Sequence, residues 1–407
     1  MCKPTDAIRF SSDVAYLTMR LLWCVVPLVF LTGCAYLANS GRPPYDGPIA
    51  KPLWTVHGLA CDATPVIYDG VAYIRARTLD SENKRLFALD LKTGKKLWTS
   101  DFTPGDIKFF INPLLFVVDD KGVAHSLDAK TGRDIFQPTP THVIIAKPAG
   151  TMLYAILDNA TIQAMDNPQH VVWSAQLPMK YFGAPVIESG SVYVSGRVEK
   201  DGVAKECRIH AFDAKTGAER WQWTSGSDDE FISKLVADPG TVYAWVGKSE
   251  GRIVAVDAAT GRTRWTVANN QYFADGPTFF DASTLLTRDS VPKALRFRGV
   301  KRATGEVAWE STTAWKYDKW TAEGERLYVG DRQAHAVLNE GGDTSPDSWL
   351  TAVDIRTGKE VWRSAKVELG DFTEPAVAAG IVVVGSWPYQ FQNKDAAFVA
   401  AFGVNQK

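Results

Sequence analysis

Residues 88–98 read Ala88-Leu89-Asp90-Leu91-Lys92-Thr93-Gly94-Lys95-Lys96-Leu97-Trp98, and this stretch decides the fold of the chain. Alternating runs precede Asp90 and follow Gly94, which favours two short strands around a tight turn. Glycine adopts the positive φ of such a turn without strain, while Asp90 and Thr93 can bond the turn's own amides. We therefore predict a β-hairpin whose Trp98 ring packs against a neighbouring unit and whose indole N–H finds a partner there.

The same phrase recurs along most of the chain. An incomplete copy, shorter by one residue, ends at Trp173. Trp54 matches only the end of the motif, and no match to its first part precedes it. Counting both, eight residues occupy the aromatic position: Trp54, Trp98, Phe136, Trp173, Trp221, Trp265, Trp309 and Trp362. Self-similarity at a period of roughly 40–50 residues indicates stacked supersecondary units.

Each hairpin is preceded by two further short strands around a turn, as in residues 64–74, 184–194 and 374–384. Four strands per unit, repeated, are typical of propeller blades, so we predict an all-β, eight-bladed β-propeller. The unit after Trp362 lacks its Trp strand, and we expect the Trp54 strand to complete it and close the ring. An open solenoid is the alternative, and it leaves the Trp54 strand unexplained.

The N-terminal residues differ from the repeats. Arg20 precedes the apolar run 21–30, which is short for a bilayer span and typical of a signal-peptide core. The run ends in Leu31-Thr32-Gly33-Cys34, which resembles a bacterial lipobox, so we predict a lipid on Cys34. A transmembrane anchor is the alternative reading. We expect a signal peptide over 1–33 with its true start at Met19, a proline-containing linker over 34–50, and the propeller over 51–407.

Composition and motifs give little sign of chemistry. The 407 residues carry a net charge of −1, which makes no case for nucleic acid or an anionic membrane surface as partner. The six histidines show no metal-ligand spacing, and we find no nucleophile or phosphate-loop motif. Cys61 and Cys207 lie in distant repeats and are expected to be packed thiols. We therefore predict no catalytic, cofactor-binding or metal-binding residue.

The hairpin phrase resembles the repeat of the pyrroloquinoline-quinone (PQQ) propeller superfamily, in which Ala-x-Asp-x-x-Thr-Gly-x-x-x-Trp recurs. One branch is the quinoprotein dehydrogenases. Membership there would imply adjacent cysteines over the quinone and a calcium site, and this chain has no Cys-Cys pair. A PQQ-dependent dehydrogenase, or a related small-molecule-binding propeller, is therefore the alternative function.

The chain looks more like the BamB lipoproteins of the outer-membrane β-barrel assembly machinery. That resemblance implies a non-catalytic periplasmic scaffold, monomeric within a complex of protein partners and anchored to the outer membrane by its lipid. Ala35 agrees with outer-membrane sorting. The Leu-x-Leu-Arg-type loop that grips the barrel-inserting subunit in BamB proteins is absent from residues 177–185, so the partner is left open.

Long loops are expected on the face opposite the Thr-Gly turns, and binding residues concentrate in such loops. Aromatic side chains mark interfaces, so we predict a protein-contact surface there. Its candidate residues are Tyr181, Phe182, Trp315, Tyr317, Trp320, Trp387, Tyr389 and Phe391. The alternative is that these rings plug the mouth of the central channel.

Overall fold

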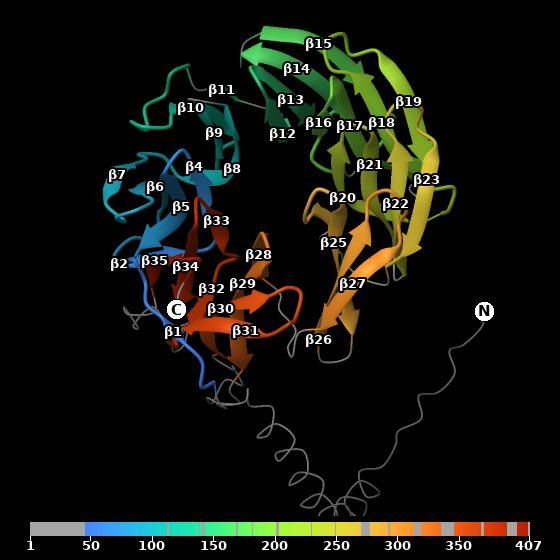
Figure 1. Ribbon diagram of the computed structural model, residues 1–407. Helices are drawn as coiled ribbons and strands as arrows, with labels where there is room; N and C mark the ends of the chain where they lie inside the picture. The colour runs from blue at the N-terminus through green and yellow to red at the C-terminus, as the bar shows by residue number, and fades with distance from the viewer. Residues whose placement is uncertain are drawn as a thin grey trace, which may run out of the picture. The chain divides into compact units, whose positions relative to one another are not determined.

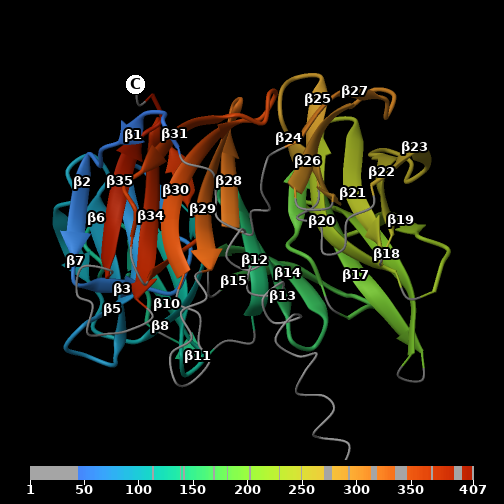
Figure 2. The same cartoon turned by 90° about the horizontal axis from the view of Figure 1, so that it is seen from below.

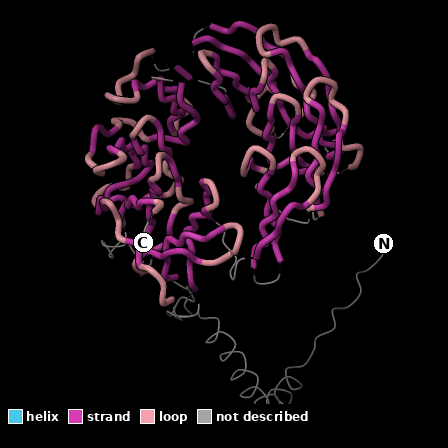
Figure 3. The backbone as a smooth tube through the Cα atoms, in the orientation of Figure 1, coloured by secondary structure: helices cyan, strands magenta, loops and turns pink. Residues whose placement is uncertain are grey.

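The computed structural model describes residues 45–405 except 112–113, 138, 141–142, 168–169, 181, 201–202, 229, 249, 270–276, 292–293, 313–318, 335–345, 368–369 and 389–396. The chain divides into two compact units, Met1–Asp46 with Gln333–Pro346 and Gly47–Arg332 with Asp347–Lys407. The regular elements of the described residues are β-strands, as Figures 1 and 3 show, and the all-β prediction is confirmed. No helix in the described ranges is long and apolar enough to cross a membrane.

Five sheets hold four antiparallel strands each, and each sheet corresponds to one sequence repeat. We number these the second to the sixth repeat. The second repeat consists of β8 (Pro104–Ile111), β9 (Leu114–Asp119), β10 (Val123–Asp128) and β11 (Thr139–Pro140), and the third of β12 (Val143–Ala149), β13 (Met152–Leu157), β14 (Thr161–Asn167) and β15 (His170–Gln176). The fourth repeat consists of β16 (Val186–Glu188), β17 (Ser191–Lys200), β18 (Val203–Asp213) and β19 (Glu219–Thr224), and the fifth of β20 (Phe231–Asp238), β21 (Thr241–Gly247), β22 (Gly251–Asp257) and β23 (Thr263–Ala268). The sixth repeat consists of β24 (Thr278–Phe279), β25 (Thr284–Val291), β26 (Ala294–Lys301) and β27 (Val307–Thr312).

Two larger sheets contain the other repeats. The seventh repeat, with a short strand added parallel to its outer edge, consists of β28 (Lys319–Glu323), β29 (Arg326–Ala334), β30 (Pro346–Asp354), β31 (Glu360–Ser364) and the added β1 (Ile49–Ala50). The first and last repeats share a ten-stranded sheet of β2 (Trp54–His57), β3 (Leu59–Cys61), β4 (Val66–Tyr68), β5 (Val71–Thr78), β6 (Lys84–Asp90), β7 (Lys96–Thr99), β32 (Gly370–Phe372), β33 (Ala376–Ala378), β34 (Ile381–Pro388) and β35 (Phe398–Gly403).

The predicted count of eight separate blades is therefore corrected. Six sheets hold one repeat each, and the first and last repeats are joined into one sheet. The joining element is β3, which pairs antiparallel with β5 and parallel with β34, where Ala60 lies opposite Ser386. The four-strand repeat did not predict this strand, because its three residues, Leu-Ala-Cys, lie outside the repeated motifs.

The strand that carries Trp54 is an outer strand of this sheet. β2 pairs antiparallel with β35, and Trp54 lies opposite Ala401. Figure 2 shows β2 and β35 next to each other with β34 beyond them. The strand that carries Trp54 thus pairs with the last described strand of the chain.

The Thr-Gly turns have the predicted structure. The Asp90 carboxylate accepts hydrogen bonds from the Thr93 amide at 2.8 Å and the Thr93 hydroxyl at 2.7 Å, and Gly94 has a φ of 70°. The hydrogen bonds from Thr93 lower the pKa of Asp90 below its ordinary value. The same pair of hydrogen bonds forms at Asp128, Asp213, Asp257 and Asp354.

Among the described residues, five of the repeated turns form a joint with the Trp of the preceding repeat. The Trp98 ring lies so close to Gly132 that a Cβ there would be 2.5 Å from the indole, and Trp98 Nε1 donates to the Ala129 carbonyl at 3.0 Å. The predicted packing and indole partner are therefore confirmed. Four further Trp residues, each on its glycine and carbonyl, repeat the joint: Trp54 on Gly94 and Leu91, Trp173 on Gly217 and Ala214, Trp221 on Gly261 and Ala258, and Trp265 on Gly305 and Arg302.

The core lies between successive sheets rather than within one. One apolar cluster joins Tyr73 and Leu86 of the first repeat to Leu115 of the second, and another joins Trp221 of the fourth to Val254 of the fifth. Middle strands are consequently buried on both faces, as in β21, all seven of whose residues are buried. Burial on both faces explains why the middle strands read as continuous apolar runs.

The Trp–Gly joint can be tested with a matched pair of glycines. Gly132 and Gly122 both have positive φ, but a Cβ at Gly122 meets nothing within 4 Å. Gly122→Ala should cost about 1–2 kcal/mol from backbone strain alone. Gly132→Ala should cost about 1–3 kcal/mol more because the methyl group displaces the Trp98 ring. Urea unfolding measures both, and equal losses would contradict the joint.

Candidate functional site

Two adjoining hollows open among the first strands of the later repeats. The first, of about 360 Å³, is lined from β20, β24, β25 and β28, and the second, of about 490 Å³, from residues around β3, β28, β32 and β34. Glu374, which precedes β33, lines both. The two hollows therefore form one continuous candidate site.

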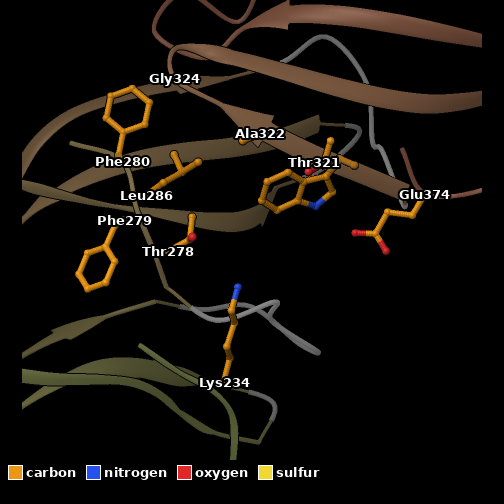
Figure 4. A pocket seen from close by; sticks show the side chains of 10 residues that line it. Lys234, Thr278, Phe279, Phe280, Leu286, Thr321, Ala322, Gly324 and Glu374 are labelled. Carbon is orange, nitrogen blue, oxygen red and sulfur yellow. The ribbon is translucent and has the colours of Figure 1, made fainter. Parts of the chain in front are cut away.

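The first hollow has aromatic walls and two charged side chains. Figure 4 shows Lys234 and Glu374 entering it from different elements, and Thr278 and Leu286 also line it. Phe280 forms part of the wall, and its ring lies 5.2 Å from that of Trp309, while the Arg356 guanidinium lies 4.9 Å from the Phe280 centroid. This stacking holds the wall in place.

The second hollow is lined by paired charges. Lys319 Nζ donates to Asp371 Oδ2 at 2.6 Å and to the Phe372 carbonyl at 2.7 Å. Asp62 forms ion pairs with Arg75 and Lys84. Burial opposes ionisation of Asp62, but the hydrogen bond from Lys84 and the charge of Arg75 outweigh it and lower the pKa of this carboxyl.

Cys61 and Cys207 are buried thiols, as predicted. Cys61 lines the second hollow, and burial, with a contribution from the neighbouring Asp62 charge, raises the pKa of its thiol far above the ordinary value. Cys207 lies in the separate cluster between the fourth and fifth repeats, and burial raises its pKa to about 11. Both are therefore protonated at neutral pH and are poor nucleophiles.

Among the described residues, no group of three His, Cys, Asp or Glu side chains is arranged to hold a metal ion. The site offers ion-paired charges and aromatic walls. Such a lining suits the binding of polar or charged groups.

Three of the eight predicted contact residues lie among the described residues, and all three are partly buried. Phe182 packs against the cluster between the third and fourth repeats, and Trp320 meets Phe297 edge-on at 6.1 Å. Trp387 has the Arg77 guanidinium 4.8 Å from its ring centroid. Tyr181, Trp315, Tyr317, Tyr389, Phe391 and Cys34 lie outside the described residues.

The structure brings Trp320 and Trp387 to the two adjoining hollows. The sequence analysis missed the charged residues beside them, including Asp62, Lys319 and Asp371, because these positions are not repeated. It also missed a recurring tyrosine that meets the Trp ring of its own repeat at Tyr73, Tyr154, Tyr193, Tyr243 and Tyr328. Its signal was available, since each follows a turn glycine by three or four residues.

Four-stranded sheets linked by Trp–Gly joints define a β-propeller of the PQQ-like repeat class. The family model described as outer membrane protein assembly factor BamB matches residues 82–169, 144–265 and 249–386. Because these matches together span most of the chain, the chain belongs to the outer membrane protein assembly factor BamB family.

Individual relatives include members of two functional groups. The chain is 23% identical over 330 residues to outer membrane protein assembly factor BamB of Burkholderia pseudomallei, covering 75% of this chain and 79% of that one. It is 24% identical over 389 residues to quinoprotein ethanol dehydrogenase of Pseudomonas aeruginosa, covering 81% of this chain and 56% of the dehydrogenase. The crystal structure of BamB from Moraxella catarrhalis is similar in fold, with a TM-score of 0.57 and 18% identity over 87% of this chain and all of that one.

Proposed function

We propose that this chain is a non-catalytic scaffold lipoprotein that binds protein partners in outer-membrane protein assembly. The observation that carries the proposal is the family match across residues 82–386. The ion-paired walls of the candidate site agree with binding rather than with catalysis. The relatives suggest the process, since several are outer membrane protein assembly factors.

The scaffold in this proposal is a propeller whose ring is closed by the ten-stranded sheet. In that sheet β3 joins β4 to β7 of the first repeat to β33 to β35 of the last, together with β2. Support comes from apolar clusters between the seventh and last repeats and between the last and first, where Trp54 and Val399 pack with Ile74. A closed ring buries the faces of every blade and gives the partner a rigid surface.

The anchor in this proposal is a lipid on Cys34, after removal of a signal peptide over 1–33 that begins at Met19. The lipobox and its preceding apolar run support this, and Ala35 agrees with sorting to the outer membrane. The linker over 34–50 contains Pro43, Pro44 and Pro48, which favour an extended chain. The propeller over 51–407 then faces the periplasm.

The anchor is tested by replacing the cysteine. Cys34→Ser should leave an unprocessed or soluble protein, because a hydroxyl cannot form the thioether to the lipid. Membrane fractionation and the mass of the mature N-terminus measure this, with Cys24→Ser in the apolar run as the matched control. A Cys34→Ser protein that is processed and fractionates with the outer membrane as before would contradict the anchor.

The partner surface in this proposal is the face of the long loops, with Trp387 as an anchor beside Trp315, Tyr317, Trp320, Tyr389 and Phe391, helped by Tyr181 and Phe182. Trp387→Ala should reduce co-purification of the partner because loss of an aromatic anchor typically costs about 2 kcal/mol of binding. Its unfolding free energy should change little. Trp320→Ala should instead destabilise the fold by about 2 kcal/mol, since its ring packs on Phe297.

Co-purification from solubilised membranes and urea unfolding of the same two variants measure these effects. A Trp387→Ala protein that is stable and binds normally would contradict the surface. If it unfolds as early as Trp320→Ala, the ring is a packing residue of the channel mouth.

The second candidate is a PQQ-dependent dehydrogenase, which the similarity to quinoprotein ethanol dehydrogenase favours. The hollow has room for a small ligand, but its described lining offers no metal-binding group. Under our proposal the purified protein, incubated with PQQ and calcium, shows no quinone absorbance and no alcohol-dependent dye reduction. Either signal would contradict the scaffold function.

A further inference from the structure

Four neighbouring repeats expose a large apolar side chain at the same position, directly before the Trp-position aromatic. These are Leu53 of the last repeat, Leu97 of the first, Ile135 of the second and Val172 of the third, with exposed fractions of 54%, 45%, 48% and 45%. Ile49 and Val171, exposed by 54% and 43%, lie on the same outer edges. We call these six residues the apolar rim.

The fold itself does not require an apolar residue at this position. In the fourth repeat it is Arg220, which donates to Asp213 and Ser191 at 2.6 Å, and in the fifth it is Arg264, which donates to Asp257 at 2.6 Å and Thr241 at 2.8 Å. An arginine therefore fits and adds bonds to the turn. The apolar residues of the other repeats need another explanation.

The Trp–Gly joints connect three residues of the rim, Leu53, Leu97 and Ile135, from one repeat to the next. Leu53 precedes Trp54, whose ring packs on Gly94, three residues before Leu97. Leu97 precedes Trp98, which packs on Gly132, three residues before Ile135. Figure 1 shows β2, β7 and β15 as outer strands of their sheets. Scattered apolar residues are normal on a protein surface, but a contiguous row indicates an interaction.

Basic side chains border the rim. The turns of the first and second repeats expose Lys92, Lys95, Lys96, Lys130 and Arg133. The carboxylates of these turns have hydrogen-bond partners: Asp90 and Asp128 accept hydrogen bonds from their own turns, and Asp134 Oδ2 lies 3.0 Å from His125 Nδ1. A near-neutral chain therefore carries a local surface that is both apolar and basic.

The rim begins where the linker meets the propeller. Ile49 follows Cys34 by fifteen residues, so the linker reaches about 50 Å at most. It joins the described structure at β1, on the outer edge of β31, and leads directly to Leu53. A lipid on Cys34 would thus let the rim reach the bilayer.

We propose that the apolar rim rests on the lipid surface, with Leu97 and Ile135 in the headgroup region and the neighbouring lysines among anionic headgroups. This inference rests on the proposed lipidation of Cys34. A lipid on a flexible linker holds a protein at a membrane without setting its orientation, and apolar residues flanked by basic ones supply a second contact that does. The surface would orient the propeller, leaving the long-loop face to proteins.

Spin labels on the lipidated full chain test the inference. Leu97→Cys and Ile135→Cys are compared with Val203→Cys and Val307→Cys, which have exposed fractions of 55% and 42% but lie off the rim. Cys61 and Cys207 are buried and should not react. Each labelled protein is reconstituted on vesicles of phosphatidylethanolamine with a minority of phosphatidylglycerol.

The rim labels should show several-fold lower accessibility to a water-soluble nickel chelate than the control labels, and higher accessibility to oxygen. Adding Lys95→Glu and Lys96→Glu should raise the chelate accessibility of the Ile135 label, because the headgroup contacts are lost. Proteins that float with the vesicles but show equal accessibility at all four labels would overturn the inference and leave the anchor intact.

Labels shielded only after partner proteins are added would also overturn it, because a protein would then cover the rim. Failure of the labelled proteins to float with the vesicles would overturn the lipid anchor itself, and the inference with it.

Discussion

The contact between a Trp ring and the glycine of the next repeat is the constraint on which the rest of the structure depends. The ring occupies the space that a side chain on the glycine would fill, and its N–H reaches a carbonyl of the same turn. The turn must therefore have Gly at one residue. An aspartate holds the turn amides in five repeats, whereas the turn at Gly305 has Lys301 at that position and still forms the joint. One short sequence phrase thus specifies both the hairpin and the packing of successive sheets.

The places where the joint is incomplete follow the same logic. Trp362 precedes the last repeat, which has no Thr-Gly turn, and no hydrogen-bond partner for its indole nitrogen is found among the described residues; its ring stacks on Phe402 instead. Near Trp309, the Ser311 hydroxyl donates to the Ile355 carbonyl, the acceptor expected for the indole. Where one element of the phrase changes, a neighbouring side chain takes over part of its role.

The repeated features were predictable from sequence because repetition multiplies a weak local signal. Comparing the copies of one sequence motif predicted the Asp90 turn and the Trp98 contact. It also predicted that the Trp54 strand pairs with the last repeat. The strand β3 and the pairs Lys319–Asp371 and Asp62–Arg75 could not be predicted, because each occurs once. The predicted aromatic contact residues also lie outside the repeated motif. Of those that the structure describes, Trp320 and Phe182 take part in packing.

Function in this propeller therefore depends on the positions that the joint leaves free. Charged residues that are not repeated line the hollows. At the position directly before the Trp-position aromatic, four repeats have exposed apolar residues and two have hydrogen-bonded arginines. The relatives of this chain include an outer membrane protein assembly factor and a quinoprotein dehydrogenase, which agrees with the rule that fold does not determine function.

The most direct test of the account is amide hydrogen exchange on a Trp54→Ala variant. Trp54 connects the last and first repeats through Gly94 and the Leu91 carbonyl. If the joint couples the sheets, protection should fall together in β35 and in β6, on both sides of the lost ring. Loss of protection confined to residues 53–57 would contradict the claim that the Trp–Gly contact holds the repeats together.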